Sequence, residues 1–251
     1  MIFTDTHCHI HESSYEDGEG AYRRALAAGV GRMLVVGTND QSSEEAVAFA
    51  RSHEQAWASL GLHPHDAKTG LDGVSFLDTI LRESTDRIVA IGEIGLDYFY
   101  DNSPREMQID LLHAQIELAQ SYNLPVIFHV REAFSDFWPI FDQYKGLRGV
   151  LHSFTDNVPN MEQALSRELL IGVNGIATFA KDRQDVYQVI PAENMVLETD
   201  APYLTPTPHR GTVNEPAFTT YVAQHIANLQ SINLQELSRV TERNATHLFS
   251  I

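Results

Sequence analysis

The sequence predicts an α/β fold, a (β/α)8 TIM barrel, and two observations support this prediction. Short apolar runs rich in β-branched residues recur along the chain of 251 residues, and stretches with the period of an amphipathic helix lie between them. Strands that alternate with helices are typical of a parallel sheet, and eight strand–helix units close a TIM barrel. The predicted strands are MIFTDTH (1–7), RMLVVG (32–37), AWASLG (56–61), RIVAIGE (87–93), PVIFHV (125–130), GVLHSF (149–154), LLIGVN (169–174) and NMVLETD (194–200).

The helical pattern is illustrated by the stretch at 105–121, where Leu111 and Leu118 fall near one apolar stripe. Two C-terminal helices are expected at 216–231 and 234–250. A doubly wound open sheet is the alternative arrangement of such strands and helices. The opening of the chain lacks the G-x-G-x-x-G turn of the dinucleotide-binding version of that sheet, which favours the barrel.

Composition limits the class of protein. No linker rich in Pro, Gly or Ser divides the sequence, so residues 1–251 are expected to form a single domain. The formal net charge of −17 excludes a protein that holds long nucleic acid by charge alone. The lone cysteine, Cys8, suits a reducing compartment. Because no apolar leader and no long apolar run occurs, we expect neither secretion nor a membrane partner. The expected protein is a cytoplasmic monomer.

Ionisable side chains gather where the predicted strands end. Residues two apart on a strand point to the same side, so Asp5, His7 and His9 share one face of the first strand. Such a group of polar side chains is costly to bury unless something binds it. In a barrel the strand ends meet at one mouth, where catalytic groups gather. The later strand ends supply His63, His65, Glu93, Asp97, His129, Arg131, His152, Glu198 and Asp200.

Six of these side chains predict a metal centre. Histidine nitrogens and carboxylate oxygens without thiolates suit Zn, Mn, Mg or Ni, and they do not resemble a cysteine-rich structural zinc site. Six ligands exceed the need of one tetrahedral ion and suit two divalent ions that share a carboxylate. Glu93 is the expected bridge because it lies between the two pairs of histidines in strand order. These pairs are His7 with His9 and His129 with His152.

Other polar groups near the predicted mouth have less definite roles. His63 and His65 are candidates for substrate contact or for support of the ligands. Arg131 follows His129 by two residues and therefore faces the same side, where it either binds a phosphate or pairs with a carboxylate. Asp97 is interpreted as a supporting carboxylate.

The motifs at these strand ends, in this order and at these spacings, resemble the TatD family of metal-dependent hydrolases. The resemblance implies a TIM barrel of the metallo-dependent hydrolase type and a divalent-metal-dependent deoxyribonuclease, often described as a 3′→5′ exonuclease. It also implies that the metal ligands are His7, His9, Glu93, His129, His152 and Asp200. The motifs are DTHCH (5–9), GLHPH (61–65), GEIGLDY (92–98), FHVRE (128–132), LHSF (151–154) and ETDAPYLTP (198–206), and the similarity extends to NATHLF (244–249).

One segment departs from the family pattern. The run PHRGTVNEP at 208–216 carries Val213 where a basic residue is common. Arg210 remains in this run, so we expect it to bind substrate phosphate together with Arg131.

The expected reaction is hydrolysis of a phosphodiester at a nucleic-acid end or in a small phosphoester. Asp200 is the expected general base toward a water molecule at the metal site, and Glu93 completes the catalytic pair. Because a fold does not determine a substrate, an aminoacyl ester on tRNA is an alternative. A metal-binding barrel without turnover is a further alternative, which the complete ligand set disfavours.

The lysines bear on the identity of the bridging ligand. Binuclear amidohydrolases often bridge their ions with a modified lysine at a strand end. The lysines of this chain are Lys68, Lys145 and Lys181, and all lie in loop-like or helix-like stretches. We therefore expect no carbamylated lysine between the ions.

Overall fold

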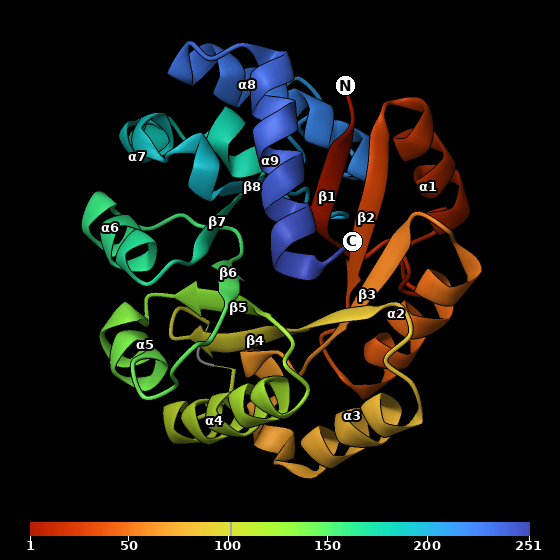
Figure 1. Ribbon diagram of the computed structural model, residues 1–251, viewed down its shortest axis with the longest axis vertical. Coiled ribbons are helices and arrows are strands. Elements are labelled where there is room, and N and C mark those ends of the chain that lie inside the picture. The colour runs from red at the N-terminus through yellow and green to blue at the C-terminus, as the bar shows by residue number, and fades with distance from the viewer. Residues whose placement is uncertain (101) are drawn as a thin grey trace. The chain divides into compact units, whose positions relative to one another are not determined.

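The computed structural model describes residues 1–100 and 102–251, in which strands and helices alternate along the chain (Figure 1). The strands are β1 (Phe3–Cys8), β2 (Val30–Val36), β3 (Ala56–Leu60), β4 (Ile88–Asp97), β5 (Val126–Arg131), β6 (Gly149–Leu151), β7 (Leu170–Val173) and β8 (Met195–Leu197). The helices are α1 (Gly18–Ala27), α2 (Asp40–Ser52), α3 (Asp72–Glu83), α4 (Arg105–Ser121), α5 (Phe134–Phe141), α6 (Val158–Ser166), α7 (Gln184–Val189), α8 (Thr219–Gln230) and α9 (Leu234–Phe249).

The order of the strands in the sheet follows their order in the sequence, from β1 to β8. The pairings that join neighbouring strands within each half of the sheet are parallel. A doubly wound sheet departs from sequence order at its switch point, so this order excludes that alternative. The predicted (β/α)8 TIM-barrel class is confirmed.

The described chain divides into two compact units. One unit consists of residues 1–35 and 153–251, and the other of residues 36–152. The prediction of a single domain over residues 1–251 stays a prediction, and each unit is described by itself below.

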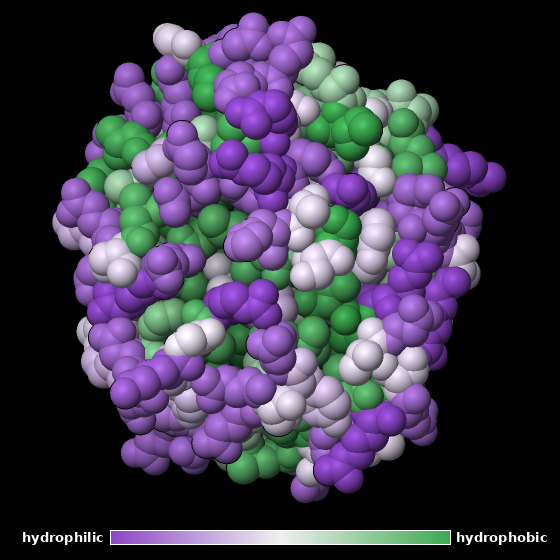
Figure 2. Space-filling view, in the orientation of Figure 1, coloured by the Kyte–Doolittle hydropathy of each residue, from purple (hydrophilic) through white to green (hydrophobic). Residues whose placement is uncertain are grey.

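The first unit contains β7, β8, β1 and most of β2. Helices α8 and α9 pack against β1 and β8, so the C-terminal helices cover the first strand of the chain. Helix α9 is amphipathic: Leu237, Val240 and Leu248 are buried. Hydrophilic side chains dominate the surface over this helix, at the upper centre of Figure 2.

The C-terminal helices confirm the expectation for residues 216–231 and 234–250, with one difference. The first begins at Thr219, because Pro216–Phe218 forms a 3-10 turn instead of a first α-helical turn. The second begins after Asn233, whose side chain accepts a hydrogen bond from the backbone N–H of Gln235 and so caps the helix.

The second unit contains β3 to β6. Helix α2 packs on β3, α4 on β4 and α5 on β5, while α3 contacts both α2 and α4. Figure 1 shows this unit in orange to green. The interior of the unit is apolar, with Leu60, Ile91, Leu96 and Phe128 fully buried. Burial on both faces explains why these strands read as nearly continuous apolar runs.

Among the described residues, no helix is both long enough and apolar enough to cross a membrane.

Candidate metal centre

The first unit brings together His7 of β1, His9 just after that strand, and the carboxylate of Asp200, which follows β8. His7 Nε2 and His9 Nε2 lie 3.2 Å apart. Asp200 Oδ1 lies 3.7 Å from His7 Nε2 and 3.4 Å from His9 Nε2. Both histidines are buried. These three residues, called the β1–β8 group below, converge closely enough to hold one metal ion.

The backbone of β1 positions Asp200. The N–H of Asp200 donates to the carbonyl of His7 at 2.8 Å, and the N–H of His9 donates to the carbonyl of Ala201 at 2.7 Å. Asp200 has a φ of 58°, the left-handed region, in which Asp and Asn are tolerated better than other side chains. This conformation turns the carboxylate toward the two imidazoles.

The buried carboxylate of Asp5 supports the backbone on both sides of the β1–β8 group. Its carboxylate accepts hydrogen bonds from the Thr199 hydroxyl at 2.6 Å, the Thr199 N–H at 2.9 Å and the His7 N–H at 3.2 Å. Burial raises the pKa of Asp5 to about 8, although these hydrogen bonds act in the opposite direction. Asp5 therefore joins the end of β1 to the segment between β8 and Asp200.

The second unit gathers three imidazoles around one carboxylate. Glu93 Oε1 lies 2.7 Å from His129 Nδ1, 3.5 Å from His63 Nε2 and 3.7 Å from His152 Nε2. Burial alone raises the pKa of Glu93, but the neighbouring imidazoles outweigh burial and hold this pKa well below its usual value. Glu93, His63, His129 and His152 are called the Glu93 group below, and the first three converge within the spacing that a metal ion needs.

A second carboxylate lies behind the Glu93 group. Asp97 Oδ2 is 3.0 Å from His129 Nε2 and 3.0 Å from His65 Nε2. Asp97 Oδ1 accepts the N–H groups of Phe99 and Tyr100. Burial lowers the pKa of His129, but the hydrogen bonds of this imidazole to both carboxylates outweigh burial and raise the pKa to about 9. Asp97 thus has the supporting position that the sequence suggested.

Close approach of two strands brings Glu93 and His129 together. A Cβ on Gly95 of β4 would lie 1.8 Å from the carbonyl oxygen of His129 in β5. A Cβ on Gly61 would likewise lie 2.6 Å from the backbone nitrogen of Glu93. Glycine is therefore required where the backbones of β3, β4 and β5 meet beside the ligands.

The six predicted ligands fall into these two groups, and one further donor joins them. The sequence placed His63 only as a substrate contact or support, whereas the structure places its Nε2 among the donors around Glu93. Burial lowers the pKa of His63, which favours the neutral imidazole that a metal requires. The signal in the sequence was that His63 follows the end of a buried strand by three residues and precedes Pro64.

The two predicted phosphate-binding arginines have different surroundings. The guanidinium carbon of Arg131 lies 4.0 Å from the ring centroid of Phe99 and 4.7 Å from that of Tyr100. Arg210 stacks on Phe179 at 3.8 Å and donates to the carbonyl of Thr205 at 2.7 Å.

Two supporting residues were missed by sequence reasoning. Thr199 holds Asp5, and Gln108 of α4 accepts the N–H of Asp97 at 2.8 Å and donates to its carbonyl at 3.1 Å. Gln108 lies on the buried side of its helix, so a polar residue within an apolar stripe was the signal.

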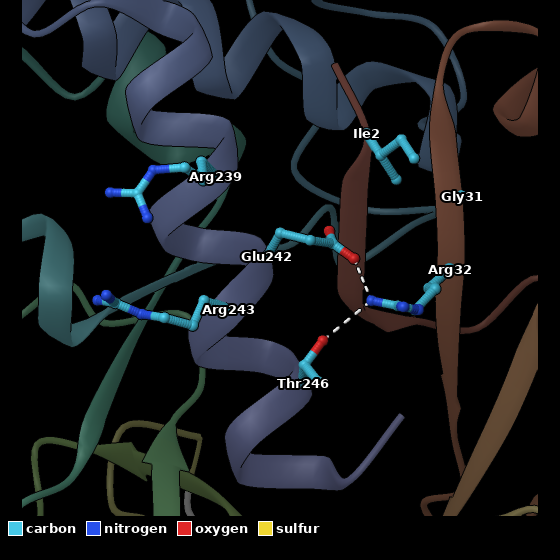
Figure 3. A pocket seen from close by; sticks show the side chains of 7 residues that line it. All are labelled: Ile2, Gly31, Arg32, Arg239, Glu242, Arg243 and Thr246. Atoms are coloured by element: carbon cyan, nitrogen blue, oxygen red, sulfur yellow. Dashed lines mark hydrogen bonds and ion pairs between the residues drawn. The ribbon is translucent and has the colours of Figure 1, made fainter.

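A cavity of about 450 Å3 lies at the other end of β1 and β2 (Figure 3). Glu242 pairs there with Arg32, which also donates to Thr246 at 3.0 Å. None of the predicted site residues lines this cavity, so it is separate from the β1–β8 group. Its lining consists of Ile2, Gly31, Arg32, Arg239, Glu242, Arg243 and Thr246.

Comparison with known proteins identifies the family to which the chain belongs. The family model described as "TatD related DNase" matches residues 4–250. The chain belongs to the TatD family. This TatD-family chain is 34% identical to the uncharacterized metal-dependent hydrolase YabD of Bacillus subtilis, over all of both proteins. It is 36% identical to the 3′-5′ ssDNA/RNA exonuclease TatD of Erwinia tasmaniensis, over 94% of this chain and 95% of that protein.

A solved relative confirms the fold of this TatD-family chain. The crystal structure of YjjV, a TatD homologue from Escherichia coli, superposes with a TM-score of 0.93 at 30% identity. The alignment covers 99% of this chain and 98% of that one. The chain is therefore a metal-dependent hydrolase with the TIM-barrel fold, and its histidine and carboxylate donors suit such an enzyme.

Proposed function

We propose that this enzyme is a divalent-metal-dependent 3′→5′ exonuclease that removes nucleotides from ends of single-stranded DNA. The observation that carries the proposal is the convergence of histidine and carboxylate donors into the β1–β8 and Glu93 groups, in a chain of the TatD family. The name of the Erwinia tasmaniensis relative, an ssDNA/RNA exonuclease, supports this substrate class. The net charge of −17 favours a bound strand end over a long duplex.

We further propose that two divalent ions act, drawn from Zn, Mn, Mg and Ni. His7, His9 and Asp200 hold one. Glu93 with His129 and His152 holds the other, with His63 as an additional donor. When bound, such ions polarise the phosphoryl group and lower the pKa of water. The bridging role of Glu93 between the ions stays a prediction.

The residues of the chain have distinct proposed roles. Asp200 accepts the proton of the attacking water, because its carboxylate is 15% exposed and is turned toward the ligands by its backbone. Arg131 and Arg210 bind phosphate oxygens through the edges of their stacked guanidinium groups. His65 stays a candidate for substrate contact.

The reaction has a definite proton balance. Water adds to phosphorus, the bond from phosphorus to the departing 3′ oxygen breaks, and a proton from solvent is taken up by that oxygen. The proton released by the water passes to Asp200 Oδ and then to solvent. We also propose that the enzyme works as a monomer, and that it resides in the cytoplasm, where its single buried cysteine would stay reduced.

The experiment that tests this function uses purified protein reconstituted with each metal in turn. Its substrates are single-stranded DNA labelled at the 5′ or the 3′ end, RNA, a phosphomonoester and an aminoacyl ester on tRNA. A 3′→5′ exonuclease releases the 3′ label at once and shortens the 5′-labelled strand stepwise. The matched control is a Glu93→Gln, His129→Ala double variant prepared in parallel.

Two results would contradict the proposal. Efficient hydrolysis of the aminoacyl ester without cleavage of any phosphodiester would assign the site to carboxylic esters. Metal binding without turnover of any substrate in the panel would identify a non-catalytic metal-binding barrel.

A further inference from the structure

Two large aromatic side chains are exposed immediately beyond β4. Phe99 is 50% exposed and Tyr100 is 53% exposed. Their rings meet edge to face with centroids 4.8 Å apart. The guanidinium of Arg131 lies over both rings, 4.0 Å from the Phe99 centroid and 4.7 Å from the Tyr100 centroid. Phe99, Tyr100 and Arg131 are called the aromatic platform below.

The aromatic platform is held in place by its backbone. The N–H groups of Phe99 and Tyr100 donate to Asp97 Oδ1 at 3.0 and 3.1 Å. The N–H of Tyr98 donates to the carbonyl of Arg131 at 3.0 Å. Because the backbone is fixed at these points, the exposed rings are presented in a defined place.

The platform adjoins the Glu93 group. Asp97, which binds the backbone of the platform through Oδ1, contacts His129 Nε2 through Oδ2 at 3.0 Å. The ring of Tyr100 also meets the ring of His65 edge to face, with centroids 5.4 Å apart. A molecule seated on the platform would therefore have its neighbouring atoms close to the proposed metal ligands.

The chemistry of the platform fits an unpaired nucleotide. Exposed aromatic rings stack on any nucleobase, and such stacking is tolerant of sequence. A guanidinium stacked on a ring keeps its N–H groups at its edge, where they can donate to a phosphate. Since the chain carries a net charge of −17, general electrostatic attraction cannot supply the affinity, and local contacts must do so.

We propose that the aromatic platform binds a nucleobase near the 3′ end of a single strand, and that Arg131 binds the adjoining phosphate. This inference rests on the proposed function, because it names how that site selects its substrate. In a duplex the faces of the bases are already stacked on their neighbours. The platform therefore provides a preference for single strands.

The test measures binding, so that it does not depend on turnover. Metal-loaded enzyme is titrated into a fluorescent single-stranded oligonucleotide with phosphorothioate linkages at its 3′ end, and anisotropy reports Kd. A second oligonucleotide has the same backbone but lacks the two 3′-terminal bases. The variants are Phe99→Leu, Tyr100→Leu and Arg131→Gln.

Wild-type enzyme is expected to bind the abasic oligonucleotide about 5- to 150-fold more weakly than the intact one, the usual worth of one stacked base. Phe99→Leu and Tyr100→Leu should weaken binding of the intact strand toward that level and change binding of the abasic strand little. Arg131→Gln should lower the slope of log K against log salt by about 0.7, the value for one phosphate of a single strand.

Trp57 and Arg87 supply a matched control. The guanidinium carbon of Arg87 lies 5.5 Å from the centroid of the Trp57 ring. Both residues lie where β3 and β4 begin, whereas the proposed ligands lie toward the other ends of these strands. Trp57→Leu and Arg87→Gln likewise remove an aromatic ring and a guanidinium group, and they should leave the Kd of both oligonucleotides unchanged. Thermal unfolding of every variant checks that the fold is retained.

The outcomes separate this inference from the proposed function. Equal binding of the intact and abasic strands by wild-type enzyme, or wild-type affinity in all three platform variants, would overturn the inference even if the enzyme cleaves DNA. Loss of affinity in the variants without any phosphodiester cleavage by wild-type enzyme would support the platform and contradict the exonuclease.

Discussion

His129 Nε2 lies 3.0 Å from Oδ2 of Asp97, a carboxylate with no exposed surface. The same imidazole directs Nδ1 to Glu93 at 2.7 Å. Asp97 therefore determines how the ring of His129 is turned and which nitrogen faces the other donors. A carboxylate behind a metal-binding histidine commonly has this effect.

We predict that Asp97→Asn weakens one of two metal sites by about 10- to 100-fold, the usual effect of losing such a carboxylate. The asparagine Oδ1 can still accept the N–H groups of Phe99 and Tyr100, so the fold should be retained. Isothermal titration with Zn2+ or Mn2+ measures both sites. The control is Asp136→Asn, which alters a carboxylate of the second unit that accepts the Tyr98 hydroxyl. Unchanged affinity at both sites would show that Asp97 does not orient a ligand.

Asp200→Asn is expected to bind metal nearly normally while turnover falls about 10²- to 10⁴-fold, the usual contribution of a positioned base. Asparagine also tolerates the left-handed φ of 58° at this position, so the backbone should not change. His7→Ala should instead lower metal affinity, and excess metal should partly restore it. Turnover is measured against metal concentration for both variants. Restoration of Asp200→Asn to wild-type turnover by added metal would leave Asp200 as a ligand only.

Gly95→Ala is predicted to lower the free energy of unfolding by about 3 kcal/mol, because overpacking forces the backbone to shift. Its Cβ would meet the His129 carbonyl oxygen at 1.8 Å. Denaturant unfolding measures the loss. Gly146→Ala is the control, since Gly146 also has a positive φ but has open space around its Cβ position. Gly146→Ala is expected to lower the free energy of unfolding by only about 1 kcal/mol, the cost of a Cβ in the left-handed backbone conformation. Equal losses in the two variants would contradict the steric explanation.

Activity is predicted to depend on added metal and not on a lysine carbamate. Lys68, Lys145 and Lys181 lie outside the strands of the structure. Replacing all three by arginine, or removing bicarbonate, should leave turnover within about twofold of wild type, as expected for surface substitutions. Chelation should abolish turnover until a divalent ion is restored. A bicarbonate requirement that disappears with one lysine would identify a carbamate bridge.

The positions of all eight strands could be predicted from the sequence within a few residues, because a buried parallel strand leaves a short apolar run. The largest difference is at the end of β4, which the sequence did not predict. The apolar run stops at Glu93, but the strand continues to Asp97, with a register shift between Ile91 and Ile94. Glu93 consequently lies within the strand and not at its end.

The sequence by itself determined the class of fold and the chemistry of the site, because strand periodicity and the kinds of donor atom are properties of the residues themselves. It also predicted six metal ligands, three of which fall in the β1–β8 group and three in the Glu93 group, and their binding of metal stays a prediction. Only the tertiary structure decided that His63 joins the donors around Glu93 and that Asp97 turns His129. It alone placed Arg131 on two exposed rings. Such distances depend on strand register and on the close approach permitted at Gly95, which are set by packing between segments far apart in the sequence.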